Sequence, residues 1–275
     1  MNLGYNREMS SLLLLKLIVV PLAIAATTKA ARRWGVVIGG LLIGMPLTSG
    51  PVSIFFALEQ GRAFAASAAR STLLGIVAVA VFCAGYAVSA RGNAWQRSAI
   101  ISILFYCLTV SALSFTAFGL WTSAAMVGVA LLAALLLIGR PAGRRVTLPA
   151  PWWDIPLRIT AATTLLILIT GSAGVLGPQL GGLLTPFPIF TFVMAIFTHA
   201  QAGPLPVRRM LHGVMIGLFS FCSFFVIVNL LVERIDLWAV YTLAAATSIT
   251  VNSFSMWLLR EREKLGAPQA VQSDG

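Results

Sequence analysis

The longest apolar stretch of this chain is too long to be one interior helix of a soluble domain. Residues 98–138 contain no charged side chain over about 41 positions, which would extend for roughly 60 Å as one helix. The hydrocarbon core of a bilayer is about 30 Å thick, and about 20 apolar residues cross it. The stretch therefore predicts two membrane spans joined by a tight turn, which we place near Ala117–Gly119.

The composition of the whole chain agrees with a membrane protein. Hydrophobic residues make up 59% of the 275 positions and charged residues only 10%, whereas a soluble domain carries about 25% charge. The net charge is +11, but the basic residues are scattered in short loops and form no nucleic-acid-binding surface. The sequence has no nucleotide, metal-ligand or catalytic motif. We expect no enzymatic activity, no cofactor, no metal site and no nucleic-acid partner.

Charges and turn-forming residues divide the chain into an all-α polytopic protein with nine transmembrane helices. Alternate loops differ in charge, and one set holds 13 of the 19 Lys and Arg residues. This bias predicts a bacterial cytoplasmic (inner) membrane protein with its N-terminus outside and its C-terminus in the cytoplasm. The first span resembles a cleavable signal peptide, but we expect it to be retained because the repeat described next requires it. The nine expected spans are 10–28, 35–58, 64–89, 98–116, 119–139, 155–175, 179–202, 207–231 and 237–259.

The chain matches itself without gaps at an offset of 142 residues. GLLIGMPLTSGPVSIFFALEQG (40–61) aligns with GLLTPFPIFTFVMAIFTHAQAG (182–203), and both glycines and a proline keep one register. The repeat unit is four helices, spans 1–4 and 6–9, with span 5 as connector. Because five spans separate equivalent points, the sequence predicts a 4+1+4 inverted-topology repeat. The expected boundaries are 1–117, 118–150, 151–260 and a cytoplasmic tail at 261–275.

Proline interrupts the second and seventh predicted helices at equivalent positions. Pro46 and Pro188 each lie about ten residues, or some 15 Å, from the nearer end of their spans. Both breaks are therefore expected near the middle of the bilayer, where non-helical backbone borders protein or a water-filled cavity. Ser49 and Thr191 follow the prolines and are candidates to cap the helix or contact a ligand. The alternative is a kink that only helps the helices to pack.

Two repeat-equivalent pairs carry charge or strong polarity. Lys16 and Arg158 are candidate ligands for an anion, or else side chains that extend to the membrane surface. Glu59 and Gln201 form the second pair, in which Glu59 is a candidate for a coupling proton. The alternative places Glu59 at a solvated helix end.

Polar side chains also recur on one face of spans 4 and 9. Tyr106 lies on span 4, and Ser248 and Asn252 lie on span 9. Tyr106 is the repeat equivalent of Ser248. Such stripes either line a path or form hydrogen bonds between helices, and the sequence leaves both open.

The repeat unit resembles the small GlpM-type four-helix membrane proteins, whose segment reads G-L-x-P-x-F-P. In both units a basic residue precedes the proline by 30 positions, and a glycine follows it by 15. The second unit's GLLTPFP is the closer match, while ALEQG of the first unit resembles the family's acidic residue before the glycine. The resemblance covers about four-fifths of the chain and implies a fused, inverted tandem of such proteins.

These observations favour a secondary transporter or a flippase-like permease with a midplane site between the two units. The expected partners are membrane lipids and an anionic small molecule or lipid headgroup, and homo-oligomerisation is left open. A passive anion channel is one alternative, and a non-transporting membrane partner of a lipid or polysaccharide synthase is another. The candidate substrate-binding residues are Lys16, Arg158, Pro46, Ser49, Pro188, Thr191, Tyr106, Ser248 and Asn252, with Glu59 and Gln201 as coupling candidates.

Overall fold

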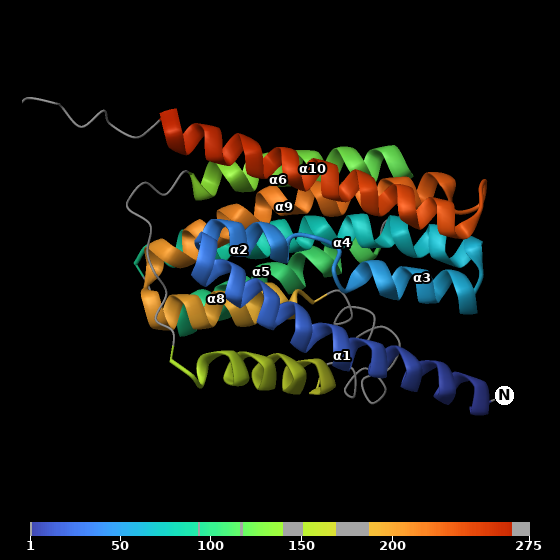
Figure 1. Ribbon diagram of the computed structural model, residues 1–275, viewed down its shortest axis with the longest axis horizontal. Helices are drawn as coiled ribbons and strands as arrows, with labels where there is room; N and C mark the ends of the chain where they lie inside the picture. Colours follow the sequence, from blue (N-terminus) through green and yellow to red (C-terminus); the bar gives the residue numbers. More distant parts are fainter. Residues whose placement is uncertain (1, 93, 116–117, 140–150, 169–186, 266–275) are drawn as a thin grey trace, which may run out of the picture.

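The computed structural model describes residues 2–92, 94–115, 118–139, 151–168 and 187–265, and all regular structure within these ranges is helical. Figure 1 shows long helices that run along a common direction. The predicted all-α class is confirmed. The helices are α1 (Asn2–Trp34), α2 (Val36–Ile43), α3 (Ser49–Glu59), α4 (Arg62–Ser89), α5 (Trp95–Ser114), α6 (Leu120–Ile138), a helix over residues 154–168, α8 (Ile189–Ala202), α9 (Pro204–Leu231) and α10 (Leu237–Leu265).

Four of the described helices, α4, α5, α6 and α9, are long and apolar enough to cross a bilayer. Large apolar side chains remain exposed on the outer helices, for example Leu108 of α5 and Val129 and Leu136 of α6. Continuous apolar surface of this kind is unfavourable in water and suits contact with lipid. The helix content and the outward-facing apolar residues therefore agree in indicating a membrane protein.

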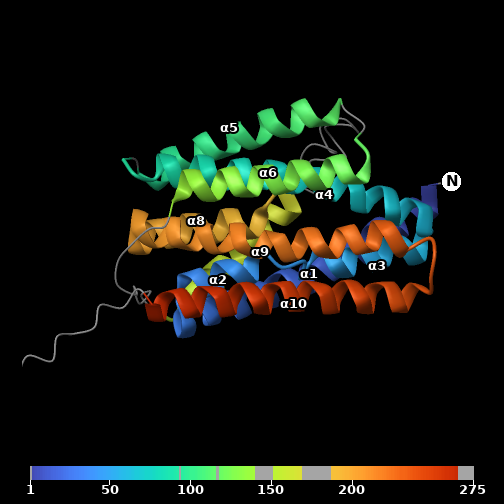
Figure 2. The ribbon, with the colours of Figure 1, turned by 90° about the horizontal axis from the view of Figure 1, so that it is seen from above.

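Helices α4 and α9 form the centre of the bundle. They pack against each other, and α6 packs against both. On either side, α4 contacts α5 while α9 contacts α10 and α2, so that α5 and α10 lie at opposite edges (Figure 2). Leu73 and Phe82 of α4 and Met215 and Val228 of α9 have no exposed surface. The buried core is thus built on the two longest uninterrupted central helices.

Glycines bring α2 unusually close to α9. Gly40 and Gly44 of α2 face Gly213 and Gly217 of α9, and a Cβ atom on any of the four would overlap backbone atoms of the other helix. The four-residue spacing on each helix is the small-xxx-small pattern that lets membrane helices approach through their backbones. This contact fixes α2, and with it the start of the helix break, on the central helix α9.

The helix break predicted at Pro46 is present in the structure. Helix α2 ends at Ile43 and α3 begins at Ser49, with Pro46 between them. Proline lacks a backbone donor and clashes with the preceding turn, so the helix stops and restarts. At the second predicted interruption, α8 begins directly after Pro188. The preceding residues 169–186 lie outside the described residues.

Two pairs of described helices, α4 with α9 and α5 with α10, keep the 142-residue register. Gly61 and Gly203 are positive-φ residues, with φ of 91° and 85°, that precede α4 and α9. Only glycine adopts this backbone region without strain, and it allows a reversal between helices over one residue. Helices α5 and α10 also begin 142 residues apart, at Trp95 and Leu237. In Figure 1, α4 and α9 run in opposite directions.

The two ends of the bundle differ in charge. One end, here called the basic end, contains the α1–α2 and α8–α9 junctions, and the C-termini of α4, α6 and α10 lie there as well (Figure 1). Lys29, Arg32 and Arg91 lie near these junctions. The opposite end contains the α3–α4 and α9–α10 junctions. The described loops of the two sets thus fall at separate ends. The predicted turn near 117–119 lies between α5 and α6, although residues 116–117 lie outside the described residues.

Candidate functional site

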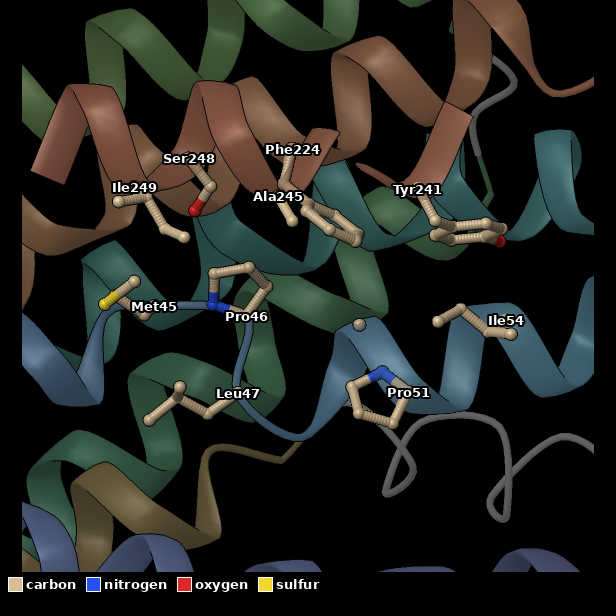
Figure 3. A pocket seen from close by; sticks show the side chains of 11 residues that line it. Met45, Pro46, Leu47, Pro51, Ile54, Phe224, Tyr241, Ala245, Ser248 and Ile249 are labelled. Atoms are coloured by element: carbon tan, nitrogen blue, oxygen red, sulfur yellow. The ribbon is translucent and has the colours of Figure 1, made fainter. Parts of the chain in front are cut away.

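A pocket of about 240 Å³ lies at the break between α2 and α3. Figure 3 shows that its walls come from three parts of the chain. Met45, Pro46 and Leu47 contribute the break itself, Phe224 comes from α9, and residues 241–249 of α10 form the facing wall. The predicted proline break therefore borders a real cavity in this structure.

The lining of the pocket is almost entirely apolar. Ser248 is the main polar exception, and its side chain points toward the ring of Pro46 (Figure 3). The Ser248 hydroxyl lies 3.4 Å from that of Ser220 on α9, so it is only weakly engaged. Such a lining binds hydrocarbon better than it binds an isolated small anion, because a desolvated charge needs compensating polar groups.

A pair of hydrogen bonds joins α3 to α10 beside the pocket. The Tyr241 hydroxyl donates to the Ser53 carbonyl oxygen at 2.7 Å and lies 2.9 Å from the Ser53 hydroxyl. Both residues are buried. The sequence analysis did not single out either residue, because their pairing depends on a contact across nearly two-thirds of the chain.

A second hollow of about 470 Å³ continues from the pocket along α3 and α10. The two hollows share Ile54, Tyr241, Ala245 and Ile249, and the second extends to Trp238. Together they form what we call the α3–α10 groove, which runs from the Pro46 break toward the opposite end of the bundle.

Asn252 lies one helical turn beyond Ser248, toward the basic end. Its side-chain amide donates to the Met45 sulfur at 3.1 Å, and its Oδ1 atom is buried with no hydrogen-bond partner among the described residues. Asn252 therefore positions a lining residue of the pocket and leaves one acceptor unused. Ser49 starts α3, directly before the lining residue Gly50.

The surroundings of Pro188 are filled by aromatic rings. The Phe187 ring centroid lies 5.4 Å from that of Tyr106, 5.3 Å from Phe192 and 6.4 Å from Phe82. The Phe82 and Phe192 centroids are 6.2 Å apart. We call these four rings the aromatic cluster. The Tyr106 hydroxyl is buried without a partner among the described residues, and Thr191 is buried on the first turn of α8.

The pocket and the aromatic cluster occupy equivalent positions of the repeat. Adding 142 to a position in the first unit gives its counterpart in the second. Three of the four cluster positions carry smaller side chains at the pocket, where the structure has a cavity in place of packed rings. The equivalent pairs, with the cluster residue first, are Phe187 and Met45, Phe192 and Gly50, Tyr106 and Ser248, and Phe82 and Phe224.

Arg158 belongs to a buried polar network at the basic end rather than to the pocket. Its Nε donates to Asp154 Oδ1 at 2.8 Å, and its NH2 donates to Gln201 Oε1 at 3.3 Å. The Gln201 amide also donates to Asp154 at 2.6 Å, and Arg32 of α1 approaches the other carboxylate oxygen at 2.6 Å. Arg158 and Asp154 are 0% and 1% exposed. The network joins α1, α8 and the helix over residues 154–168.

Asp154 is the central acceptor of this network. Burial alone would raise its pKa, but the hydrogen bond from Gln201 and the positive charge of Arg158 outweigh burial, and the pKa lies below its ordinary value. Asp154 was not among the residues singled out from the sequence. Its spacing of four residues from Arg158 on a helix is a recognisable ion-pair signal.

The remaining predicted residues lie apart from the pocket. Glu59 is exposed at the end of α3, at the opposite end of the bundle from its repeat equivalent Gln201. Lys16 belongs to α1, and its side chain lies outside the described residues. Of the predicted substrate-binding residues, the structure therefore brings Pro46, Ser49, Ser248 and Asn252 together around one cavity.

No family model, curated protein or solved structure matches the chain.

Proposed function

We propose that the chain is a secondary transporter or flippase-like permease whose substrate site is the pocket at the Pro46 break. The observation that carries the proposal is a proline-interrupted helix that borders a cavity inside a bundle of membrane-length apolar helices. Broken helices beside a midplane site are typical of secondary transporters. A kink that served packing alone would be expected to be filled by neighbouring side chains, as the aromatic cluster fills the surroundings of Pro188.

The full proposal includes nine spans in a 4+1+4 inverted repeat. Helices α4 and α5 pack on each other as α9 and α10 do, and the start of each helix keeps the 142-residue register. The first break contacts α9 and α10 of the second unit, while Phe187 at the second break contacts Phe82 and Tyr106 of the first. Reciprocal contacts of this kind support a two-fold relation between the units.

The arrangement also supports alternating access. The α3–α10 groove leads from the pocket toward the opposite end of the bundle. At the basic end, the network of Arg32, Asp154, Arg158 and Gln201 joins three helices and closes the bundle. With the N-terminus outside and the C-terminus in the bacterial cytoplasm, this conformation is the outward-open state.

The proposed substrate is an amphiphile with an anionic headgroup rather than a small free anion. The positive charge of Arg158 is already balanced by Asp154, and the pocket walls are apolar. A passive anion channel is less well supported, because the aromatic cluster occupies the second break and the described part of the pocket offers few polar groups.

The test is transbilayer movement in reconstituted liposomes. A phospholipid with a short fluorescent chain and an anionic headgroup is followed by quenching from outside, and radiolabelled phosphate serves as a free anion. We expect saturable movement of the lipid, lost in Gly50→Phe, which places a ring where Phe192 lies in the second unit. Gly128→Phe on α6 is the matched control, because Gly128 faces open space. Movement equal to that in protein-free liposomes contradicts the proposal, and non-saturating phosphate flux would indicate a channel.

A further inference from the structure

The mouth of the pocket opens sideways, at a depth that hydrocarbon occupies. Leu47 and Ile249 line the pocket and are 38% and 55% exposed. Leu47 directly follows the break, some 15 Å from the basic end and hence near the middle of a core of about 30 Å. Building on the proposed function, we infer that the α3–α10 groove binds the hydrocarbon chain of a lipid that enters laterally from the bilayer.

The length of the groove matches one leaflet. Ile249 at the pocket and Trp238 at the far end of the second hollow are separated by about 11 residues of α10, or some 16 Å. Half of a core of about 30 Å is 15 Å. A lipid chain lying along α10 therefore extends from the headgroup region near Trp238 to the Pro46 pocket. Trp238 is 61% exposed, as expected for an aromatic residue at the interface.

In the second unit, the positions equivalent to the pocket lining are filled by aromatic side chains. At the equivalent positions, the chain supplies its own rings from Phe187, Phe192 and Tyr106. Met45, Gly50 and Ser248 take these places in the first unit and leave the cavity. A hydrocarbon chain restores the missing apolar contacts, whereas a polar solute would lose its hydration without finding partners.

The experiment uses the full-length protein in nanodiscs that contain an anionic phospholipid with a diazirine near the end of one acyl chain. After irradiation, mass spectrometry locates the adducts. We expect enrichment on Met45–Ile54 and on residues 241–249. Gly50→Phe should lower labelling of residues 241–249 about tenfold, the loss expected when roughly two methylene groups no longer fit. Gly128→Phe should leave that labelling unchanged.

Ser248→Tyr provides a second filling variant if Gly50→Phe does not fold, as judged by elution volume and thermal midpoint. Adducts spread evenly over the outward faces of α5 and α6, without enrichment at the groove, would overturn the inference. The same preparations are assayed for lipid movement. Labelling of the groove without lipid movement would support the chain-binding groove and contradict the transporter proposal. Lipid movement without labelling of the groove would contradict chain binding in the groove and support the transporter proposal.

Discussion

Around Pro46 the chain places methionine, glycine and serine where, around Pro188, it places two phenylalanines and a tyrosine. Each proline lies shortly before the start of a helix, α3 or α8, and the residues beside each proline contact helices of the other unit. The sequence pattern is thus repeated, while the side-chain volume is not. One break borders a cavity of about 240 Å³, and the other is filled by the aromatic cluster.

The two prolines thus lie in similar sequence patterns whose neighbouring side chains differ in volume. The second unit also holds the buried pair of Asp154 and Arg158, whereas the position equivalent to Asp154 in the first unit is Leu12. We therefore expect the second unit to act as the rigid half and the first to carry the ligand. Matched substitutions at equivalent positions test this asymmetry.

The largest effect is expected for Asp154→Asn. It leaves Arg158 and Arg32 without a negative partner in a buried site, which costs about 3–5 kcal/mol. Glu59→Gln, at the position equivalent to Gln201, is exposed and should change stability by less than about 0.5 kcal/mol. Thermal unfolding in detergent compares the two variants. Equal shifts in midpoint would contradict the assigned role of the network.

The ion pairs that Asp154 makes with Arg158 and Arg32 should be lost only at low pH. The pKa of Asp154 is lower in the folded protein than its ordinary value of 3.8, so its stabilisation is complete above that value and is lost as pH falls below it. The difference in stability between the wild type and Asp154→Asn should therefore stay constant from neutral pH down to about pH 5. A difference that shrinks between pH 7 and pH 5 would show that Asp154 is not held in its charged form.

The next largest effect is a difference in stability between Phe82→Ala and Phe224→Ala. Both phenylalanines are buried and repeat-equivalent, but Phe82 contacts the rings of the filled cluster while Phe224 borders the existing pocket. We expect a cost of about 4 kcal/mol for Phe82→Ala and about 3 kcal/mol for Phe224→Ala, since cost grows with the cavity created. Denaturant titration measures both. A larger loss of stability for Phe224→Ala than for Phe82→Ala would contradict an open pocket at Pro46 and a filled cluster at Pro188.

The smallest effects come from removing single hydroxyls. Tyr241→Phe loses hydrogen bonds to Ser53 and should destabilise the protein by about 1 kcal/mol. Tyr106→Phe removes a buried hydroxyl without a partner among the described residues and should be neutral or stabilising by up to about 1 kcal/mol. The thermal midpoint should therefore fall for Tyr241→Phe and stay the same or rise for Tyr106→Phe. An equal fall for both variants would contradict the different hydrogen bonding of the two hydroxyls.

Much of the framework was predictable from local sequence. The 142-residue register located the break at Pro46 and both turns at Gly61 and Gly203, because proline and glycine act on the backbone itself. The four-residue spacing of a close helix crossing was also present in the sequence, at Gly40 and Gly44 and at Gly213 and Gly217, but it was not used to predict one. The nine-span count and the membrane orientation stay predictions.

The open and filled states of the breaks were not predictable, because each depends on side chains from the other unit. Pro46 meets Ser248, about 200 positions away, and no local pattern shows that contact. Arg158 looked like a free cation for the same reason. Gln201, which accepts a hydrogen bond from Arg158, and Arg32, which pairs with Asp154, reach this site only through the folded arrangement of three helices.

The most direct test of the asymmetry compares Ser49→Cys with Thr191→Cys in a background without the native cysteines. The two residues are repeat-equivalent and lie in the first turns of the helices after the two prolines, and cysteine resembles both in size. Ser49 is half-buried beside the pocket, whereas Thr191 is 4% exposed near the aromatic cluster. The rate of modification by a membrane-permeant maleimide is measured in liposomes. Rapid reaction at position 49, slowed by an anionic phospholipid, with protection at position 191, is the predicted result. Equal rates, or faster reaction at position 191, would contradict one open and one filled break.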